Sequence, residues 1–128
     1  MTYQHPLNEY AVAPRFEFES FAVFSNGLAD SVRLVPPGVC LNPSCSAYFD
    51  PARAWQLYCC DACRRVDIAE LRRVGLKAAP AMLAWQSGRY SKDADLQALC
   101  RAGRNYVSNL QAVWVRDRLN RTKLAGGI

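Results

Sequence analysis

The sequence lacks the features that mark membrane and secreted proteins. None of its 128 residues belongs to a run of about 20 apolar residues, so no transmembrane helix is expected. The segment Met1 to Tyr10 has no basic part followed by an apolar part, so a secretory signal is not expected. We therefore expect a soluble, cytoplasmic chain of about one domain without a membrane partner. In a reducing compartment, cysteines bind metal more often than they form disulfides.

Histidine is nearly absent. The one histidine, His5, lies near the N-terminus and outside any motif, so we interpret it as a solvated residue. Nucleases that hold a metal and activate water with histidine are therefore not expected. We expect no enzyme activity and no small-molecule substrate.

Basic residues are scarce in the first part of the chain and abundant in the rest. Residues 1–52 contain two basic and five acidic residues, a net charge of −3, whereas residues 53–128 contain fourteen basic and six acidic residues, a net charge of +8. Such an asymmetry favours an anionic partner for the second part. Solvated helix faces are the alternative interpretation.

The segment before the cysteines predicts a small β region. Phe16 and Phe18 alternate with Glu17 and Glu19, which is the period of a half-buried strand. Asn26-Gly27 is a turn signal, and residues 31–35 could form the return strand. Pro36-Pro37-Gly38 then marks a boundary, so we expect an N-terminal β region over residues 1–37.

Residues 38–76 contain two cysteine pairs at the spacing of a metal site. Cys40 and Cys45 form the first pair, thirteen residues follow, and Cys59, Cys60 and Cys63 form the second group. Aromatic residues on both sides of Asp50-Pro51 predict a β-hairpin between the pairs. A helix is expected after Cys63, with Asp61 as a candidate N-cap and Gly75 as its end. A knuckle, a hairpin and a helix that carries the second pair make a treble-clef arrangement.

The cysteine segment resembles small zinc-binding segments of many bacterial and phage proteins. The resemblance rests on Cys40-x4-Cys45, Tyr48-Phe49 and Tyr58-Cys59-x3-Cys63-Arg64, about 26 residues of the chain. The segment is less closely similar to the CGNR zinc finger, whose signature is absent because Arg64-Arg65 follows Cys63. The resemblance implies a zinc site and, in many such proteins, a DNA-binding or regulatory role, although the motif also occurs as a structural staple.

The identity of the fourth ligand depends on the resemblance. It implies Cys59, with Cys60 at a position that is usually serine, whereas spacing alone would allow Cys60-x2-Cys63. We expect one structural zinc ion held by Cys40, Cys45, Cys59 and Cys63, because four cysteines leave no open position for water. Unliganded buried cysteines or a disulfide are the alternative.

The remainder of the chain predicts helices over residues 77–123 and a disordered tail over 124–128. Pro80 can start a short helix to Gln86. A longer helix is expected from about Ser91, with Gly103 as a possible break or kink and an apolar stripe that serves as core or as a partner groove. Cys100 beside the stripe is interpreted as a core residue. The predicted fold class is therefore α+β: an N-terminal β region, a treble-clef zinc module and C-terminal helices.

Basic residues on these helices are candidate phosphate ligands, because the planar guanidinium suits phosphate and guanine edges. The candidates are Arg64, Arg65, Arg72, Arg73, Arg101, Arg104, Arg116, Arg118, Arg121 and Lys123. The main hypothesis is a small zinc-binding DNA-binding regulator of bacterial or phage type. The alternative is a zinc-stapled module for protein interaction or assembly, with a protein partner or self-association and no nucleic acid.

Overall fold

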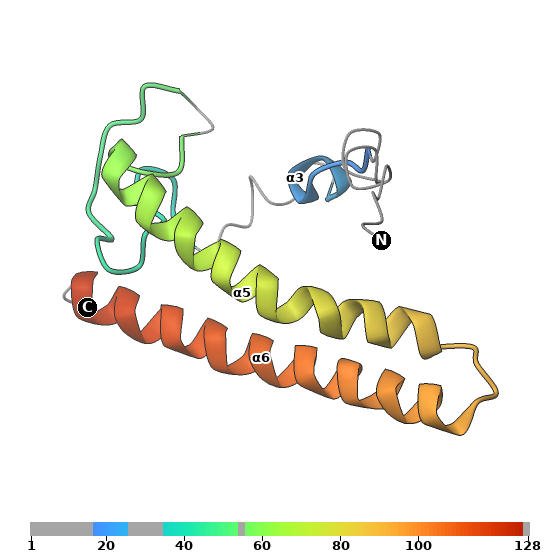
Figure 1. Ribbon diagram of the computed structural model, residues 1–128. Coiled ribbons are helices and arrows are strands. Elements are labelled where there is room, and N and C mark those ends of the chain that lie inside the picture. Colours follow the sequence, from blue (N-terminus) through green and yellow to red (C-terminus); the bar gives the residue numbers. More distant parts are fainter. Residues whose placement is uncertain (1–16, 26–34, 54–55, 127–128) are drawn as a thin grey trace, which may run out of the picture. The chain divides into compact units, whose positions relative to one another are not determined.

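The computed structural model describes residues 17–25, 35–53 and 56–126 (Figure 1). The chain divides into two compact units, residues 1–34 and residues 35–128. The second unit contains the cysteines and two long helices. The sequence-based boundary between residues 76 and 77 lies inside the first of these helices.

The described part of the first unit contains one helical turn and no strand. Residues Phe21–Phe24 form one turn of helix, α3, and the hydroxyl of Ser20 caps it by accepting a hydrogen bond from the backbone N–H of Val23 at 3.4 Å. The expected strand is therefore wrong for residues 17–25, because the Ser20 cap lets the apolar run close a helical turn. The expected return strand over residues 31–35 lies almost entirely outside the described residues.

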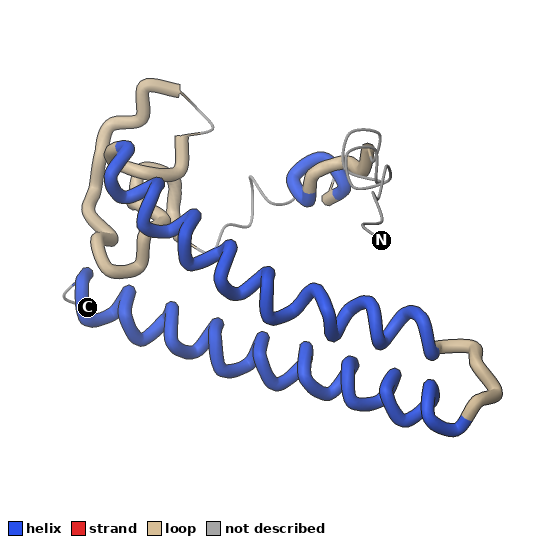
Figure 2. Tube along the Cα trace, in the orientation of Figure 1, coloured by secondary structure: helices blue, strands red, loops and turns tan. Residues whose placement is uncertain are grey.

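Two long helices run antiparallel through the second unit (Figures 1 and 2). Helix α5 spans Asp61–Gly88, and helix α6 spans Ala94–Gly126. The expected breaks are wrong: α5 continues through Gly75 and Pro80, and α6 continues through Gly103. Pro80 is exposed, so water can solvate the carbonyl group that loses its helical partner. The tail expected to be disordered is helical to Gly126, and its last two residues lie outside the described ones.

Small residues let the helices approach closely at the end of the pair that is distant from the four clustered cysteines. A Cβ atom added at Gly103 would lie 3.0 Å from the backbone nitrogen of Trp85 and would collide with the carbonyl oxygen of Ala81. One added at Gly88 would lie 2.8 Å from the Cβ atom of Cys100. Glycine is therefore required at both positions by packing, which explains why Gly103 lies in the middle of a helix.

The fold class α+β is wrong for the residues that the structure describes. Their only β pairing is an isolated bridge between Val39 and Tyr48, and no strand is present (Figure 2). The segment expected to be a β-hairpin is a loop, apart from residues 54–55, which lie outside the described ranges. In this loop the side chain of Gln56 accepts from the N–H of Ala52 at 2.9 Å and donates to the carbonyl oxygen of Tyr58 at 2.7 Å. These local bonds replace the ladder of a hairpin.

No helix in the described part of the chain has the length and apolar content to cross a membrane.

Candidate metal centre

Four cysteine sulfur atoms converge in the second unit. The Sγ atoms of Cys40, Cys45, Cys59 and Cys63 all lie within 4.8 Å of one another. The Sγ atom of Cys59 lies 3.8 Å from that of Cys45 and 3.7 Å from that of Cys63. Four sulfur atoms at this separation can hold one metal ion.

The spacing fits the coordination that zinc prefers. A tetrahedral zinc ion with Zn–S bonds of about 2.3 Å places its sulfur ligands about 3.8 Å apart. The two distances at Cys59 agree with this value. If all four thiolates bound such an ion, they would leave no open position for a reacting water.

A tight turn supplies the first pair of ligands. The carbonyl oxygen of Asn42 accepts hydrogen bonds from the N–H groups of Cys45, at 2.9 Å, and of Ser46, at 3.0 Å, and the Asn42 side chain accepts from the N–H of Ser44. Ser46 has a positive φ of 52°, and its hydroxyl donates to the carbonyl oxygen of Pro43 at 3.0 Å. These bonds hold a left-handed residue, which reverses the chain after Cys45.

The start of α5 supplies the second pair. Cys59 precedes the helix, Cys60 is its N-cap residue, and Cys63 lies in the first turn. The backbone N–H of Cys59 points at the Sγ atom of Cys40 at 3.4 Å, which joins the two halves of the site. The turn and the helix expected to supply the two cysteine pairs are thus present, and the described residues between them form no hairpin.

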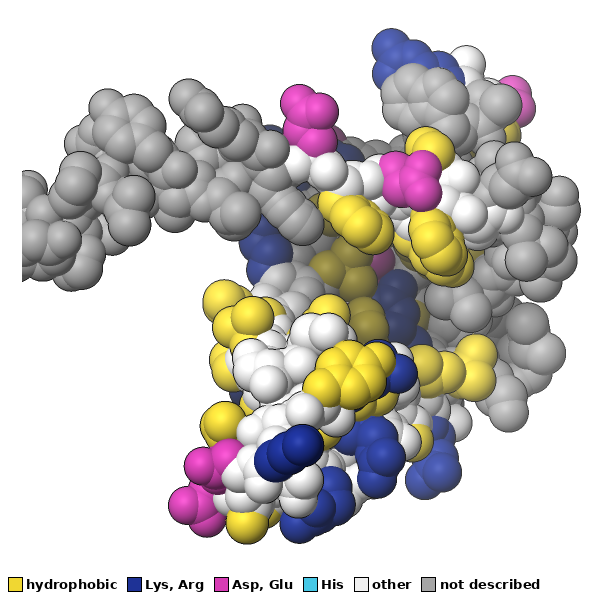
Figure 3. Space-filling view, turned by 90° about the vertical axis from the view of Figure 1, so that its right-hand side faces the viewer, with side chains coloured by type: hydrophobic (Ala, Val, Ile, Leu, Met, Phe, Trp, Pro, Cys, Tyr) yellow, Lys and Arg dark blue, Asp and Glu magenta, His cyan; other side chains and the backbone are white. Residues whose placement is uncertain are grey.

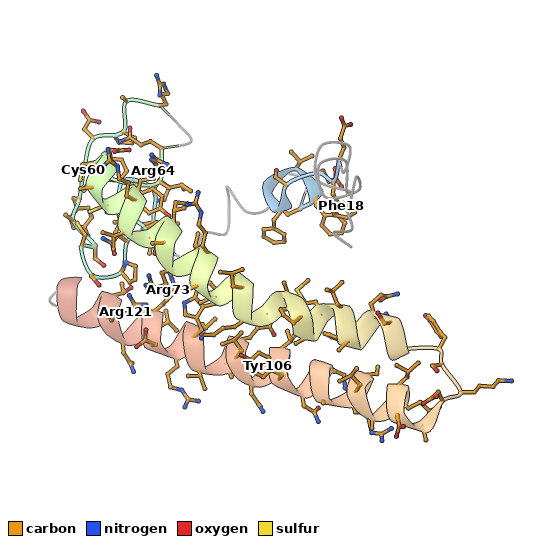
Figure 4. The ribbon with its side chains drawn as sticks, viewed as in Figure 1. Phe18, Cys60, Arg64, Arg73, Tyr106 and Arg121 are labelled. Carbon is orange, nitrogen blue, oxygen red and sulfur yellow. The ribbon has the colours of Figure 1, made fainter. Side chains whose placement is uncertain are left out.

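Cys60 lies at the edge of the cluster. Its side chain is exposed, and its sulfur is not among the four that lie within 4.8 Å of one another, although it lies 3.7 Å from the Sγ atom of Cys59. Figure 4 shows Cys60 and Arg64 at the beginning of α5. The geometry therefore favours Cys59 over Cys60 as the fourth ligand.

The thiols differ in their electrostatic surroundings. A hydrogen bond from the backbone of Ala47 lowers the pKa of Cys45, whereas burial raises the pKa of Cys40. Removal from water and then the neighbouring thiols of Cys63 and Cys60 raise the pKa of Cys59 above its usual range. Clustered thiols resist ionisation because their negative charges repel, and a bound divalent cation reverses this effect.

A buried carboxylate connects the loop that carries Cys40 and Cys45 to both helices. Asp67 of α5 is the most deeply buried charged residue among those described, with 1% of its side chain exposed. It accepts a hydrogen bond from the hydroxyl of Tyr58 at 2.7 Å and forms an ion pair with Arg118 of α6 at 2.8 Å. Arg118 also donates to the carbonyl oxygen of Leu41 at 3.1 Å. One guanidinium therefore ties the loop of the first ligand pair to both helices.

Glu70 extends this network by one turn of α5. It forms ion pairs with Arg118 at 2.7 Å and Arg121 at 2.8 Å, and it accepts from the indole N–H of Trp114 at 2.9 Å. Hydrogen bonds from Arg121, followed by those of Trp114 and Arg118, lower the pKa of Glu70 to about 2. Among the described residues, no buried side-chain nitrogen or oxygen atom lacks a hydrogen-bond partner. The network is thus fully satisfied, which is the condition for a polar cluster to stabilise a fold.

Sequence reasoning missed this network. It treated Arg118 and Arg121 as phosphate ligands and did not consider Asp67 and Glu70. The signal lay in the spacing. Asp67 and Glu70 lie three residues apart and therefore share one face of a helix, and the oppositely charged Arg118 and Arg121 do the same. Only the pairing of α5 with α6 shows that the two faces meet.

The structure separates the candidate phosphate ligands into different surroundings. Arg118 has 12% of its side chain exposed and Arg121 has 29%, and both bind carboxylates of the network. Arg64 and Arg65 are exposed and form ion pairs with Asp61. The remaining arginines among these candidates are exposed and lie on both helices, namely Arg72, Arg73, Arg101, Arg104 and Arg116. The side chain of Lys123 lies outside those that the structure describes.

Comparisons of the chain with protein-family models, with curated proteins and with solved structures find no match.

Proposed function

We propose that this is a small zinc-binding protein in which a structural four-cysteine site holds the base of a helical hairpin, and that the hairpin is a protein-interaction module. The metal is proposed as zinc because the sulfur spacing and the all-thiolate ligand set suit a tetrahedral zinc ion. We propose no catalytic role, because the ligands fill the coordination shell.

The observation that carries the interaction role is the exposure of hydrophobic side chains on α5 and α6. Neither helix has a fully buried large hydrophobic side chain among its described residues; the buried positions of α5 are Asp67 and Gly88. Figure 3 shows hydrophobic side chains on the surface of the hairpin, between Lys and Arg side chains. Apolar residues spread over several faces of a helix are typical of helices that other elements cover.

DNA binding is the second candidate. It is supported by the net charge of +5 and by Arg65 and Arg72, which lie seven residues apart and therefore on one face of α5. The case for DNA binding is weakened because two of the candidate phosphate ligands, Arg118 and Arg121, form ion pairs with Glu70 inside the hairpin.

Metal removal and DNA titration together test the proposal. Purified protein is expected to contain about one zinc per chain, and a chelator is expected to release it and to lower the helical circular dichroism signal, because the loop and the helix ends lose their common anchor. Zinc-loaded protein is expected to show no tight binding to duplex DNA at low salt by fluorescence anisotropy. Tight binding that weakens steeply with salt, and that is lost in the Arg65→Ala/Arg72→Ala variant, would replace the interaction role with the DNA-binding one.

A further inference from the structure

A fifth thiol lies beside the four that converge. The sulfur of Cys60 lies 3.7 Å from the Sγ atom of Cys59 but outside the group of four, and its side chain is exposed. Together with Arg53, Tyr58 and Arg64, it lines a surface cavity of about 440 Å³. Small solutes can therefore reach this thiol, although the four-cysteine site does not use it.

The side chain of Cys60 can turn towards Cys63. Cys60 is the N-cap residue of α5, with an extended backbone (φ −156°, ψ 168°), and its side chain makes no capping hydrogen bond. An N-cap side chain normally reaches towards the backbone N–H of the third helical residue, which here is Cys63. Rotation of the Cys60 side chain therefore brings its sulfur towards that of Cys63 and breaks no capping bond.

Backbone geometry makes Cys63 a better disulfide partner for Cys60 than Cys59 is. The Cα atoms of bonded cysteines usually lie about 4.4–6.8 Å apart. The carbonyl oxygen of Cys60 accepts from the N–H of Arg64 at 3.2 Å, so Cys60 belongs to the first helical turn. Residues three apart in such a turn have Cα atoms roughly 5 Å apart, which fits a disulfide. Adjacent residues such as Cys59 and Cys60 have Cα atoms about 3.8 Å apart, which is too close for an unstrained bond.

From these observations we propose that Cys60 is a peroxide-sensitive thiol, which removes Cys63 from the metal site by forming a disulfide with it. The inference rests on the proposed function, and it adds regulation by oxidation to the same four-cysteine site. Cys60 reacts first because it is exposed and is not one of the four converging thiols.

The reaction has two steps. The sulfur of Cys60 attacks one oxygen of hydrogen peroxide, so that an S–O bond forms, the O–O bond breaks, and a sulfenic acid and one water result. The thiolate of Cys63 then attacks the sulfenic sulfur, so that the S–S bond forms and the S–O bond breaks. The departing hydroxide takes a proton from solvent and becomes a second water. The two sulfur atoms together lose the two electrons that reduce the peroxide.

The disulfide weakens the metal site. Three thiolates remain where four held the ion, so the affinity for zinc falls and the ion is released. The loop that carries Cys40 and Cys45 keeps its hydrogen bond between Leu41 and Arg118 but loses its metal link to the start of α5. Oxidation therefore loosens the base of the hairpin, and a thiol reductant that opens the disulfide restores the site.

The test is zinc release from zinc-loaded, full-length protein during treatment with hydrogen peroxide, read by a zinc-sensitive dye. Wild type is expected to release zinc at least about tenfold faster than Cys60→Ser, because a serine hydroxyl forms neither a sulfenic acid nor a disulfide. Circular dichroism and zinc content before oxidation confirm that each variant is folded and loaded.

Cys100→Ser is the matched control. Its thiol donates to the carbonyl oxygen of Trp85 at 3.1 Å, at the end of the hairpin that is distant from the four clustered cysteines. The rate of zinc release from this variant is expected to stay within about twofold of wild type, because the lost thiol lies outside the reaction.

Peptide mapping identifies the bonded pair. Trypsin cleavage after Arg53 and Arg64 gives one peptide that contains Cys59, Cys60 and Cys63. The oxidised protein is denatured, alkylated, digested and analysed by tandem mass spectrometry. The alkyl label is expected on Cys59, with Cys60 and Cys63 joined to each other.

Three results would overturn the inference. They are equal rates of zinc release from wild type and Cys60→Ser, equal protection by Cys60→Ser and Cys100→Ser, and an oxidised wild type in which Cys60 is not joined to Cys63. Any of them in a protein that carries one zinc would overturn regulation by oxidation alone and leave the proposed function in place. A protein that binds no zinc before oxidation would instead contradict the proposed function.

Discussion

At the scale of single residues, the structure distinguishes neighbours that the sequence shows as equivalent. Cys59 and Cys60 are adjacent, yet only Cys59 belongs to the group of four converging sulfur atoms. Arg116 and Arg118 both lie on α6, yet Arg116 is exposed and Arg118 binds a buried carboxylate. Each pair supplies a test in which one member is the control of the other.

The first test concerns the adjacent cysteines. Cys59→Ser is expected to release zinc to a competing chelator at much lower concentration than wild type, because one thiolate of the tetrahedron is lost. Cys60→Ser is expected to hold zinc as wild type does and to change the free energy of unfolding by no more than about 0.5 kcal/mol, since its side chain is exposed. The measurement is a chelator competition read by a zinc-sensitive dye. A Cys60→Ser variant that lost zinc while Cys59→Ser kept it would reverse the ligand assignment.

The second test concerns the buried ion pair. Arg118→Ala leaves the carboxylate of Asp67 buried without its cation, so we expect it to reduce the free energy of unfolding by about 3–5 kcal/mol. Arg116→Ala removes an exposed side chain of the same type and is expected to change it by less than about 0.5 kcal/mol. Urea unfolding of zinc-loaded protein measures both values. Equal effects of the two substitutions would show that the network does not stabilise the hairpin.

The third test uses the carboxyl group of Glu70. Its pKa is about 2 in the folded protein against an ordinary value of 4.5, so its ion pairs stabilise the fold above about pH 4.5. This contribution, on the order of 3 kcal/mol, is lost as the pH falls from about 4.5 towards about 2. Glu70→Gln is therefore expected to be less stable than wild type at neutral pH and to approach it in acid, as measured by urea unfolding at a series of pH values. Zinc loss in acid affects both proteins equally, so a constant difference between them would contradict the role of Glu70.

At the scale of the elements, the convergence of Cys40, Cys45, Cys59 and Cys63 was predictable and the secondary structure around them was not. Two cysteine pairs at short spacing indicate a metal site because the constraint is local: each pair needs one turn of the chain. The loop between the pairs has the aromatic residues of a hairpin, but hydrogen bonds of Gln56 hold it in another conformation. Propensity rules predicted the wrong ends for the helices for a related reason, since packing between α5 and α6 overrides the cost of Gly75, Pro80 and Gly103.

Substitutions at two helix glycines distinguish the effect of helix packing on stability from the effect of helix propensity. An added Cβ atom at Gly103 would meet the backbone of α5, whereas one at Gly75 has nothing within 4 Å. Gly103→Ala is therefore expected to destabilise the protein by about 1–3 kcal/mol through overpacking. Gly75→Ala is expected to stabilise it by up to about 1 kcal/mol, which is the gain in helix propensity. Thermal unfolding shows whether each substitution raises or lowers the stability of the protein. Stabilisation by Gly103→Ala would contradict the close approach of the helices.

At the scale of the whole chain, a hairpin of two long helices with small, polar and charged residues at its inner face has little hydrophobic core of its own. The largest fully buried side chains among the described residues are those of Asp67, Pro43 and Cys40, which lie in or beside the loop that carries Cys40 and Cys45. We therefore expect the four-cysteine site and the Asp67 network to provide most of the stability of the second unit, and we propose that the surface of the helices carries the interaction role. The pairing of two helix faces could not be predicted from the sequence, because each face alone fits several partners.

X-ray absorption spectroscopy at the zinc edge tests the central claim most directly. Protein purified without added metal is expected to contain one zinc per chain, with four sulfur ligands at about 2.3 Å and no nitrogen or oxygen ligand. The Cys60→Ser variant is expected to give the same spectrum, and the Cys63→Ser variant is expected to lose the four-sulfur shell. A mixed sulfur and oxygen shell in the wild-type protein, or the absence of zinc from a folded protein, would contradict a closed four-cysteine site that anchors the hairpin.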